Sequence, residues 1–331
     1  MLDCGTHNVP NQESRSMSTS NRGFTGRVLL LVLIAFLPAV GIYLYANGEI
    51  RSLQLANQEQ ELLRATRETS VEYNRLLEES RVLLATLAEF PQVNGMQQPE
   101  CTNILGRVFD QANDLNGIWA IGLDGYVGCG SVQPDGLLYL GDRTYYIRAM
   151  NENRHIIGSY QIGRVTGRPG VASAIPVPDE SGMPGGVLIA SIDLRALSET
   201  AQDMELPQSS TFTVLDREGR VLVRYPSGQS EGDTIGAMRT EGFPDAADEP
   251  GIVHGADLDG SMSVFAVAPL TGEGATPEGY IAIGRPEGQI SSEASDVVNR
   301  TLGLVALAGL ALLTAAWIFG RYLIARPSPA G

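Results

Sequence analysis

Two long runs of uncharged, largely apolar residues lie near the two ends of this chain, at residues 28–46 and 301–320. About 20 apolar residues at a rise of about 1.5 Å each match a hydrocarbon core about 30 Å thick. The sequence therefore predicts two transmembrane helices with a long polar segment between them. A cleaved signal peptide is the alternative for the first run, but that run is long for such a segment and no A-x-A-like site follows it promptly.

The tails outside these runs carry more basic than acidic residues, with Arg15, Arg22, Arg27, Arg321 and Arg326 against Asp3 and Glu13. The cytoplasmic flanks of membrane helices collect such positive charge. We therefore expect residues 1–27 and 321–331 to be cytoplasmic tails and the segment between the two runs to lie outside. Met17 is an alternative start that would leave a short cytoplasmic lead.

The chain contains no lysine, so all 23 basic residues are arginine. This excludes a phosphate-binding P-loop lysine, a Schiff base and a lysine general base. The three histidines have no metal-ligand partner at helical or loop spacing, and the sequence contains no H-E-x-x-H motif. The sequence therefore predicts a protein that is not an enzyme and that needs no metal or cofactor.

Acidic residues outnumber basic ones, 38 against 23, which leaves a formal net charge of −15. Nearly all of the acids lie between the two apolar runs. An anionic surface repels nucleic acid, so no nucleic-acid partner is expected. The excess of acidic residues indicates a well-solvated exterior, and by itself it does not identify a ligand.

Cys101 and Cys129 both fall in the segment predicted to lie outside the membrane, where an oxidising compartment permits disulfides. Cys101 opens an apolar-periodic segment, and Cys129 ends a strand-turn-strand pattern. A disulfide between them would tie a helix to the sheet on which it packs. A pair of buried free thiols is the alternative.

Residues 48–90 contain no proline and no glycine after Gly48, and they are rich in strong helix formers. Together they predict a helix about 60 Å long. Leucines spaced by seven residues or a multiple of seven form one apolar stripe along this helix, namely Leu55, Leu62, Leu76 and Leu83. Thr66, Thr69 and Ser80 interrupt the apolar columns, which favours a helix that dimerises and also carries a domain on its flank over a pure coiled coil.

Beyond residue 99 the pattern changes to short β-like runs separated by Gly, Pro and Asp turns. Hairpins are predicted around Asp124-Gly125, Asp179 to Gly182 and Arg217 to Gly219, and a closing pair joins SMSVFAVAPL to GYIAIGR. A helix should begin at LRALSETAQDM. Two units thus share one order, which predicts an α+β fold with two tandem antiparallel sheets backed by helices.

Several motifs together resemble the double Cache family of PAS-like extracytoplasmic sensor domains. They are Asp142-Arg143-x-Tyr145-Tyr146, the stretch GRVTGRP at residues 163–169, Ala174 to Pro176, and the turn before GGVLIASIDL. The long helix and the cysteine pair also fit. Members occur in bacterial histidine kinases, diguanylate cyclases and chemoreceptors, so the resemblance implies a two-pass protein of the bacterial inner membrane with a periplasmic sensor domain.

The resemblance implies a small ligand in the membrane-distal unit. Arg143 would bind a ligand carboxylate, with Tyr145 and Tyr146 beside it, and Asp179 would receive an ammonium group. Trp119 and Tyr160 are further candidates for the pocket wall. The ligand would be a small polar metabolite, either a carboxylate or an amino-acid-like molecule.

Each of these residues also has a plainer interpretation. Arg143 could pair with Asp142 or Glu152 on a solvated face, and Asp179 could be the first residue of a turn, where aspartate is favoured. Tyr145 and Tyr146 are adjacent, so one of them could pack while the other lines a cavity. Trp119 and Tyr160 could be core aromatics. His155 is expected on the surface beside Arg154.

The resulting division has seven parts: a tail (1–27), a span (28–46), the long helix (48–90), a membrane-distal Cache unit (91–200), a membrane-proximal Cache unit (201–290), a span (301–320) and a tail (321–331). The segment RYLIARP in the last part resembles the lead into a HAMP linker, so the cytoplasmic output domain or protein is expected outside this chain. We expect a receptor that acts as a parallel homodimer. An extracytoplasmic protein-interaction subunit without a small-molecule ligand is the alternative.

Labelling of Cys4 tests the predicted topology. A membrane-impermeant thiol reagent should leave Cys4 unmodified in intact cells and should modify it after permeabilisation, because the first tail is expected inside. Modification of Cys4 from outside would contradict this topology.

Overall fold

The computed structural model describes residues 56–179, 181–226, 234–245, 248–271 and 276–288, together with residue 41 and parts of 303–318. Within these residues, no helix has both the length and the apolar character that crossing a membrane requires. The first predicted span lies outside the described residues except for residue 41, and the second is described only in part. Leu55–Ile290 form one compact unit, to which the following description applies.

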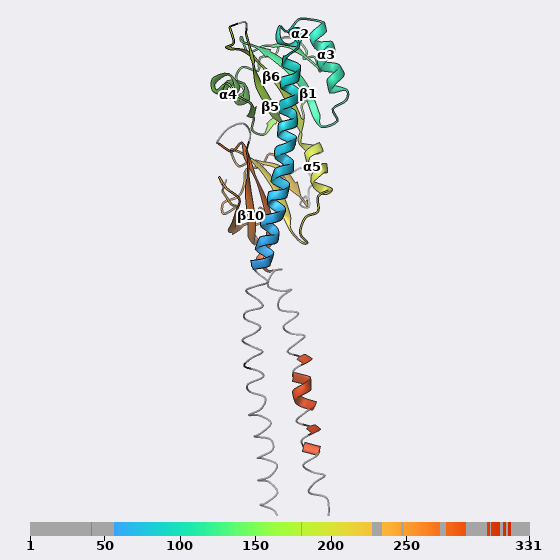
Figure 1. The fold of residues 1–331 in the computed structure, drawn as a ribbon, viewed down its shortest axis with the longest axis vertical. Coiled ribbons are helices and arrows are strands. Elements are labelled where there is room, and N and C mark those ends of the chain that lie inside the picture. The colour runs from blue at the N-terminus through green and yellow to red at the C-terminus, as the bar shows by residue number, and fades with distance from the viewer. Residues whose placement is uncertain are drawn as a thin grey trace, which may run out of the picture. The chain divides into compact units, whose positions relative to one another are not determined.

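Two antiparallel sheets form the body of this unit (Figure 1). The first sheet has the strand order β2-β1-β6-β5-β3, with β4 also paired to β5, and the second has the order β8-β7-β11-β10-β9. The first comprises β1 (Leu115–Gly122), β2 (Val127–Gly130), β3 (Ile156–Ile157), β4 (Gln161–Ile162), β5 (Pro169–Pro178) and β6 (Pro184–Asp193). The second comprises β7 (Thr211–Asp216), β8 (Val221–Tyr225), β9 (Gly251–Ala256), β10 (Met262–Leu270) and β11 (Gly279–Pro286). The predicted α+β class with two tandem PAS-like antiparallel sheets is confirmed.

The predicted hairpins are present at β1–β2, β5–β6 and β7–β8, and β10 pairs with β11 as expected. Gly125, Gly182 and Gly219 hold their turns at φ of 81°, 79° and 82°. Glycine adopts this left-handed conformation without a steric penalty. The short strands β3, β4 and β9 were not predicted, because runs of two residues or polar runs such as GIVHGA carry too little periodicity.

Besides the long helix, the described part of this unit contains α2 (Pro91–Asn94), α3 (Glu100–Phe109), α4 (Thr144–Glu152) and α5 (Leu194–Gln202). Both faces of the first sheet are buried. On one face, Ile118 and Leu188 pack with α3 and the long helix; on the other, Trp119 and Ile189 pack with α4. This alternation places α4 alone over one face of the sheet, and α4 carries the predicted site residues Tyr145 and Tyr146.

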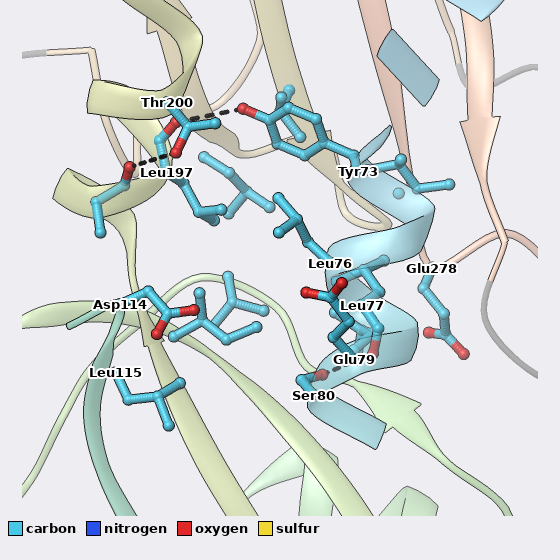
Figure 2. Close-up of a pocket in the computed structure, with 18 of the residues that line it drawn as sticks. Tyr73, Leu76, Leu77, Glu79, Ser80, Asp114, Leu115, Leu197, Thr200 and Glu278 are labelled. Atoms are coloured by element: carbon cyan, nitrogen blue, oxygen red, sulfur yellow. Dashed lines mark hydrogen bonds between the residues drawn. The ribbon is translucent and has the colours of Figure 1, made fainter. Parts of the chain in front are cut away.

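The long helix is helical over residues 56–88, and Pro91 occupies the first position of α2 rather than only ending the preceding helix. Its leucine stripe faces the protein's own sheets. Leu62 is 1% exposed in the core of the second sheet, and Leu84 is fully buried against the first. Leu76 and Leu77 border a cavity between the helix and both sheets (Figure 2). The interpretation of Leu62 as part of a dimer seam is therefore wrong; Leu55 lies outside the described residues.

Hydroxyl groups on the long helix, among them that of Ser80, which interrupts an apolar column, attach the helix to the sheets. Ser70 Oγ donates to the carbonyl of Pro269 in β10 at 2.9 Å. Ser80 Oγ lies 2.8 Å from Ser173 Oγ in β5, and Ser173 Oγ lies 2.8 Å from His155 Nε2. His155 is 3% exposed, so its predicted surface position is wrong. These buried polar contacts give the hydroxyl side chains of this helix partners within its own domain.

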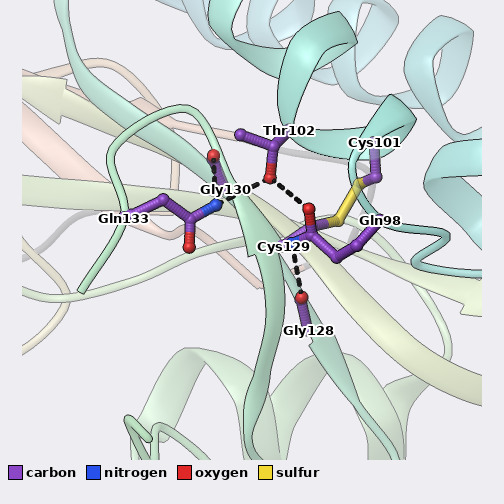
Figure 3. Close-up of a disulfide and its surroundings, with 7 residues drawn as sticks. All are labelled: Gln98, Cys101, Thr102, Gly128, Cys129, Gly130 and Gln133. Carbon is purple, nitrogen blue, oxygen red and sulfur yellow. Dashed lines mark hydrogen bonds between the residues drawn. A yellow bond between two sulfur atoms is a disulfide. The ribbon is translucent and has the colours of Figure 1, made fainter. Parts of the chain in front are cut away.

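A disulfide joins Cys101 of α3 to Cys129 of β2, with their Cα atoms 6.1 Å apart (Figure 3). Around it, Gln98 Nε2 donates to the carbonyl of Gly128 at 3.0 Å, and Thr102 Oγ1 donates to Gln98 Oε1 at 2.9 Å. The bridge closes a separation of 28 residues. In the chain-entropy model such a loop stabilises the fold by roughly 3 to 4 kcal/mol.

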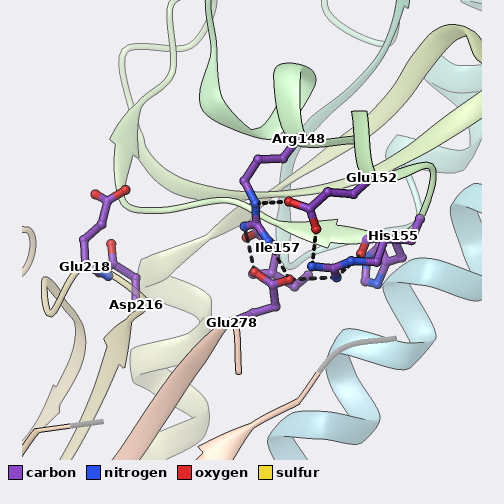
Figure 4. A network of polar contacts seen from close by, with 8 residues as sticks. Arg148, Glu152, His155, Ile157, Asp216, Glu218 and Glu278 are labelled. Atoms are coloured by element: carbon purple, nitrogen blue, oxygen red, sulfur yellow. Dashed lines mark hydrogen bonds and ion pairs between the residues drawn. The ribbon is translucent and has the colours of Figure 1, made fainter. Parts of the chain in front are cut away.

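A buried carboxylate joins the two sheets (Figure 4). Glu278 lies immediately before β11, and its side chain is 1% exposed. Its two oxygens accept from Arg148 Nη1 and Nη2 at 2.8 and 2.9 Å, and Arg154 Nη1 donates to it at 2.8 Å. This hydrogen bonding raises the pKa of Arg148 above its usual value. Glu152 also pairs with both arginines but is 35% exposed.

We predict that Glu278→Gln lowers the free energy of unfolding by about 3 kcal/mol, because removing one partner of a buried ion pair leaves the remaining charge uncompensated. Glu152→Gln, which touches the same arginines from a more exposed position, should cost no more than about 1 kcal/mol. Denaturant unfolding of the two variants measures this difference. Equal losses of unfolding free energy in the two variants would show that the burial of Glu278 does not increase its contribution to stability.

Candidate functional site

A small cavity of about 20 Å³ lies between α4, the first sheet and the loop that precedes β5. Among the residues in its wall are Trp119, Arg143, Tyr145, Gln161 and Arg164. A cavity needs roughly 10–15 Å³ to hold one water molecule. The pocket as it stands therefore has room for about one water molecule, and a larger ligand requires its walls to move.

Arg143 caps the start of α4 with an extended backbone, which turns its side chain toward this cavity. Its Nη2 donates to the carbonyl of Ile162 at 3.4 Å, whereas its Nε is buried and has no hydrogen-bond partner in the described part of the chain. The ion pairs with Asp142 and Glu152 that formed the plainer interpretation are absent among the described residues, because both carboxylates bind other arginines. A buried donor without a partner is costly, so this guanidinium is suited to receive an anion.

A second arginine lines the same cavity. Arg164 donates from Nη1 and Nη2 to Asp142 at 2.7 and 2.6 Å and from Nη1 to the carbonyl of Tyr139 at 2.8 Å. Hydrogen bonding from Arg164 lowers the pKa of Asp142. The contact fastens the loop at residues 163–168 to the segment that carries Arg143.

Two predicted aromatic residues share the cavity with Arg143. Tyr145 is 4% exposed, and burial raises its pKa to about 12, so its hydroxyl stays protonated at neutral pH. Trp119 directs its Nε1 to the carbonyl of Val132 at 2.8 Å, which fixes the ring against the pocket. These two residues and Arg143 form the part of the predicted site that the structure brings together.

The other three predicted residues lie elsewhere. Tyr146 donates its hydroxyl to the carbonyl of Gly122 at 2.8 Å and so supports the β1–β2 turn. Tyr160 packs against the core of the second sheet, and its backbone N–H donates to Asp216. Asp179 lies in the exposed β5–β6 turn, where Oδ1 accepts from the Ser181 hydroxyl at 2.6 Å and from its N–H at 2.8 Å. These bonds lower the pKa of Asp179 and match the turn interpretation.

Gln161 and Arg164 were missed by sequence reasoning. Both fall in or beside the stretch GRVTGRP that was quoted for the family resemblance. Nothing in the spacing of either residue indicates that it faces α4, because an irregular loop has no periodicity from which a direction can be inferred.

A larger cavity of about 180 Å³ lies at the junction of the long helix, α5 and the two sheets, where it is lined mainly by apolar side chains (Figure 2). Arg143 and the two aromatic residues around it are not among its lining residues. The two cavities are therefore separate features of the molecule.

Residues 47–294 match the Cache domain family in its double form, dCache. The match covers most of the 331 residues, and the chain belongs to this family. Cache domains are sensory ligand-binding modules, and the wall chemistry of the cavity beside α4, with two guanidinium groups and two aromatic rings, is consistent with that role.

Solved structures with the same fold include the ligand-binding domain of the chemoreceptor CtaA from Pseudomonas fluorescens in complex with L-isoleucine. It has a TM-score of 0.59 at 15% identity over 73% of this chain and 98% of that one. The ligand-binding domain of PctB, an amino acid chemoreceptor of Pseudomonas aeruginosa PAO1, in complex with L-Arg has a TM-score of 0.56 at 16% identity, covering 71% and 97%. At these identities the likeness concerns the fold.

Among curated proteins, Sporulation kinase D of Bacillus subtilis (strain 168) is 22% identical over 213 residues, which is 63% of this chain and 40% of the kinase. The match thus spans less than half of that relative's length.

Proposed function

We propose that this chain is the sensing part of a membrane signalling receptor and that it binds a small ligand with a carboxylate group in the cavity beside α4. The observation that carries this proposal is the buried Nε of Arg143, which lacks a partner in the described structure. A guanidinium offers two parallel donors to a carboxylate, and the rings of Trp119 and Tyr145 supply the walls. Complexes of related domains with amino acids support this class of ligand.

The loop at residues 163–168 would open to admit the ligand, because about 20 Å³ is too small for an amino acid. Opening breaks the contact of Arg164 with Asp142, both of which are substantially exposed, at 38% and 48%. An exposed ion pair of this kind contributes about 1 kcal/mol or less. A ligand carboxylate that replaces Asp142 at Arg164 would close the loop again around the bound molecule.

Movement of α4 would reach the second sheet through Glu278. Arg148 lies on α4 and Arg154 follows two residues after its end, and both hold Glu278, which lies immediately before β11. β11 in turn leads toward the second apolar run. A coupling free energy of about 1–3 kcal/mol between ligand and output is typical of such receptors.

Membrane attachment completes the proposed receptor. The apolar runs at 28–46 and 301–320 would be transmembrane helices, with the Cache units at 91–200 and 201–290 in the periplasm and both tails in the cytoplasm. The likeness to Sporulation kinase D and to chemoreceptor domains supports an output domain or output protein on the cytoplasmic side.

Arg143→Ala tests the site. A thermal-shift screen of amino acids and small carboxylates with the full chain identifies a binder through a raised melting temperature. For that binder, Arg143→Ala should weaken affinity by tenfold to a hundredfold, since a charge-assisted hydrogen bond is worth about 1.5–3 kcal/mol. Titration calorimetry measures the change.

Two further variants sharpen this measurement. Arg107→Ala, which removes an exposed arginine on α3, is the matched control and should leave affinity unchanged. Asp142→Asn should strengthen binding, because it frees Arg164 for the ligand. If Arg143→Ala and Arg107→Ala behave alike, the carboxylate does not bind at Arg143.

We propose further that two copies associate through the outward face of the long helix, because its leucines face inward. Val71 and Val82 are 69% and 48% exposed. They are separated by three helical turns and therefore share one face. Ion pairs such as Arg64–Glu68 and Arg75–Glu72 flank them.

Disulfide cross-linking tests this arrangement in a Cys4→Ser background. Val71→Cys should cross-link between protomers in membranes, whereas Leu62→Cys, at a position that is 1% exposed, should not. A lack of cross-linking at both Val71→Cys and Val82→Cys would exclude association through this face.

A further inference from the structure

The junction cavity is built by four parts of the fold. The long helix contributes Tyr73 and Leu76, α5 contributes Ala196 and Leu197, and both sheets supply further wall residues. The wall residues from the first sheet are Leu115, Ile157, Val171 and Ile192. The wall residues from the second sheet are Val214, Leu215, Leu222 and Leu270. With a volume of about 180 Å³, it exceeds the cavity of about 150 Å³ that holds benzene in an engineered protein. The space therefore suits one ring or a branched chain of similar size.

The polar groups in its inner wall already have partners. Tyr73 donates its hydroxyl to the carbonyl of Leu197 at 3.3 Å, and Ser80 Oγ donates to the carbonyl of Leu77 at 2.7 Å. Glu278 holds Arg148 and Arg154. A polar group of a ligand placed against this wall would lose its water without a replacement. The inner part of the cavity therefore selects an apolar group.

Carboxylates stand at the edge of the cavity. Asp114 and Glu79 are exposed, and Figure 2 shows them approaching the same space from the strand side and from the helix side. Glu79 pairs with the exposed Arg75. The side chain of Asp114 makes no hydrogen bond or ion pair with any described residue, so it remains available to a cation. The hydroxyl of Thr200, also at this edge, can accept a further hydrogen bond.

We propose that this cavity is a second ligand site, which takes a small amphiphilic cation with its compact hydrocarbon body inside and its ammonium group at Asp114. The site is distinct from the cavity beside α4 in position and in charge. Because its walls come from the long helix and both sheets, an occupant fixes their mutual arrangement. It would thereby modulate the same receptor from a second input.

The test uses the full chain and three probes of equal shape, namely 2-phenylethylamine, 2-phenylethanol and phenylacetate, in titration calorimetry. The amine should bind tightest, the neutral alcohol more weakly and the carboxylate weakest. Asp114→Asn should weaken the amine about tenfold and leave the alcohol unchanged, since only the amine carries the charge that pairs with Asp114. Ala196→Phe should fill the cavity and abolish binding of both.

Arg143→Ala is the control for the other site and should leave amine binding unchanged, so a failure of either site can be told from a failure of the other. The proposal is overturned if the amine does not bind, if Arg143→Ala removes its binding, or if the amine binds equally well to Asp114→Asn. Asp114 is exposed, so this variant keeps the test decisive even if Ala196→Phe does not fold.

Discussion

The buried carboxylate of Glu278 is the contact on which the arrangement of the two sheets depends. It belongs to the second sheet by sequence, yet both of its arginine partners belong to α4 and the residues after it. A carboxylate that is 1% exposed requires such partners, because an uncompensated charge in a low-dielectric interior is strongly unfavourable. The pairing therefore holds α4 in one position relative to β11, and α4 is the helix on which the candidate site is built.

The long helix provides a second connection of a different kind. Its apolar side chains enter the cores of both sheets, and Ser70 and Ser80 add hydrogen bonds at two heights. Packing along this helix is interrupted where Leu76 and its neighbours border the junction cavity. The contact through Glu278 is specific and polar, whereas the contact through the helix is extended and largely apolar. Together they make the two sheets one mechanical unit.

The candidate site shows which of its residues could be predicted from residue types and motifs and which could not. Arg143, Tyr145 and Trp119 were named from the family resemblance and share one cavity. Tyr146 is adjacent to Tyr145, but a helix turns by about 100° per residue, so its hydroxyl reaches the β1–β2 turn instead. Asp179 and Tyr160 are also placed elsewhere. Arg164 joins the cavity only because the loop before β5 folds back over α4.

The sequence by itself determined the α+β class and the hairpins, because each depends on local periodicity or turn chemistry. It indicated the bridge between Cys101 and Cys129 but left buried free thiols as an alternative, and the structure decided for the disulfide. The tertiary structure alone decided which face of the long helix is buried, since a leucine stripe suits a partner helix as well as a sheet. It also decided that Glu278 meets Arg148 across 130 positions of the chain. Contacts between residues so far apart leave no periodic pattern in the sequence, and they exist only once both sheets have formed.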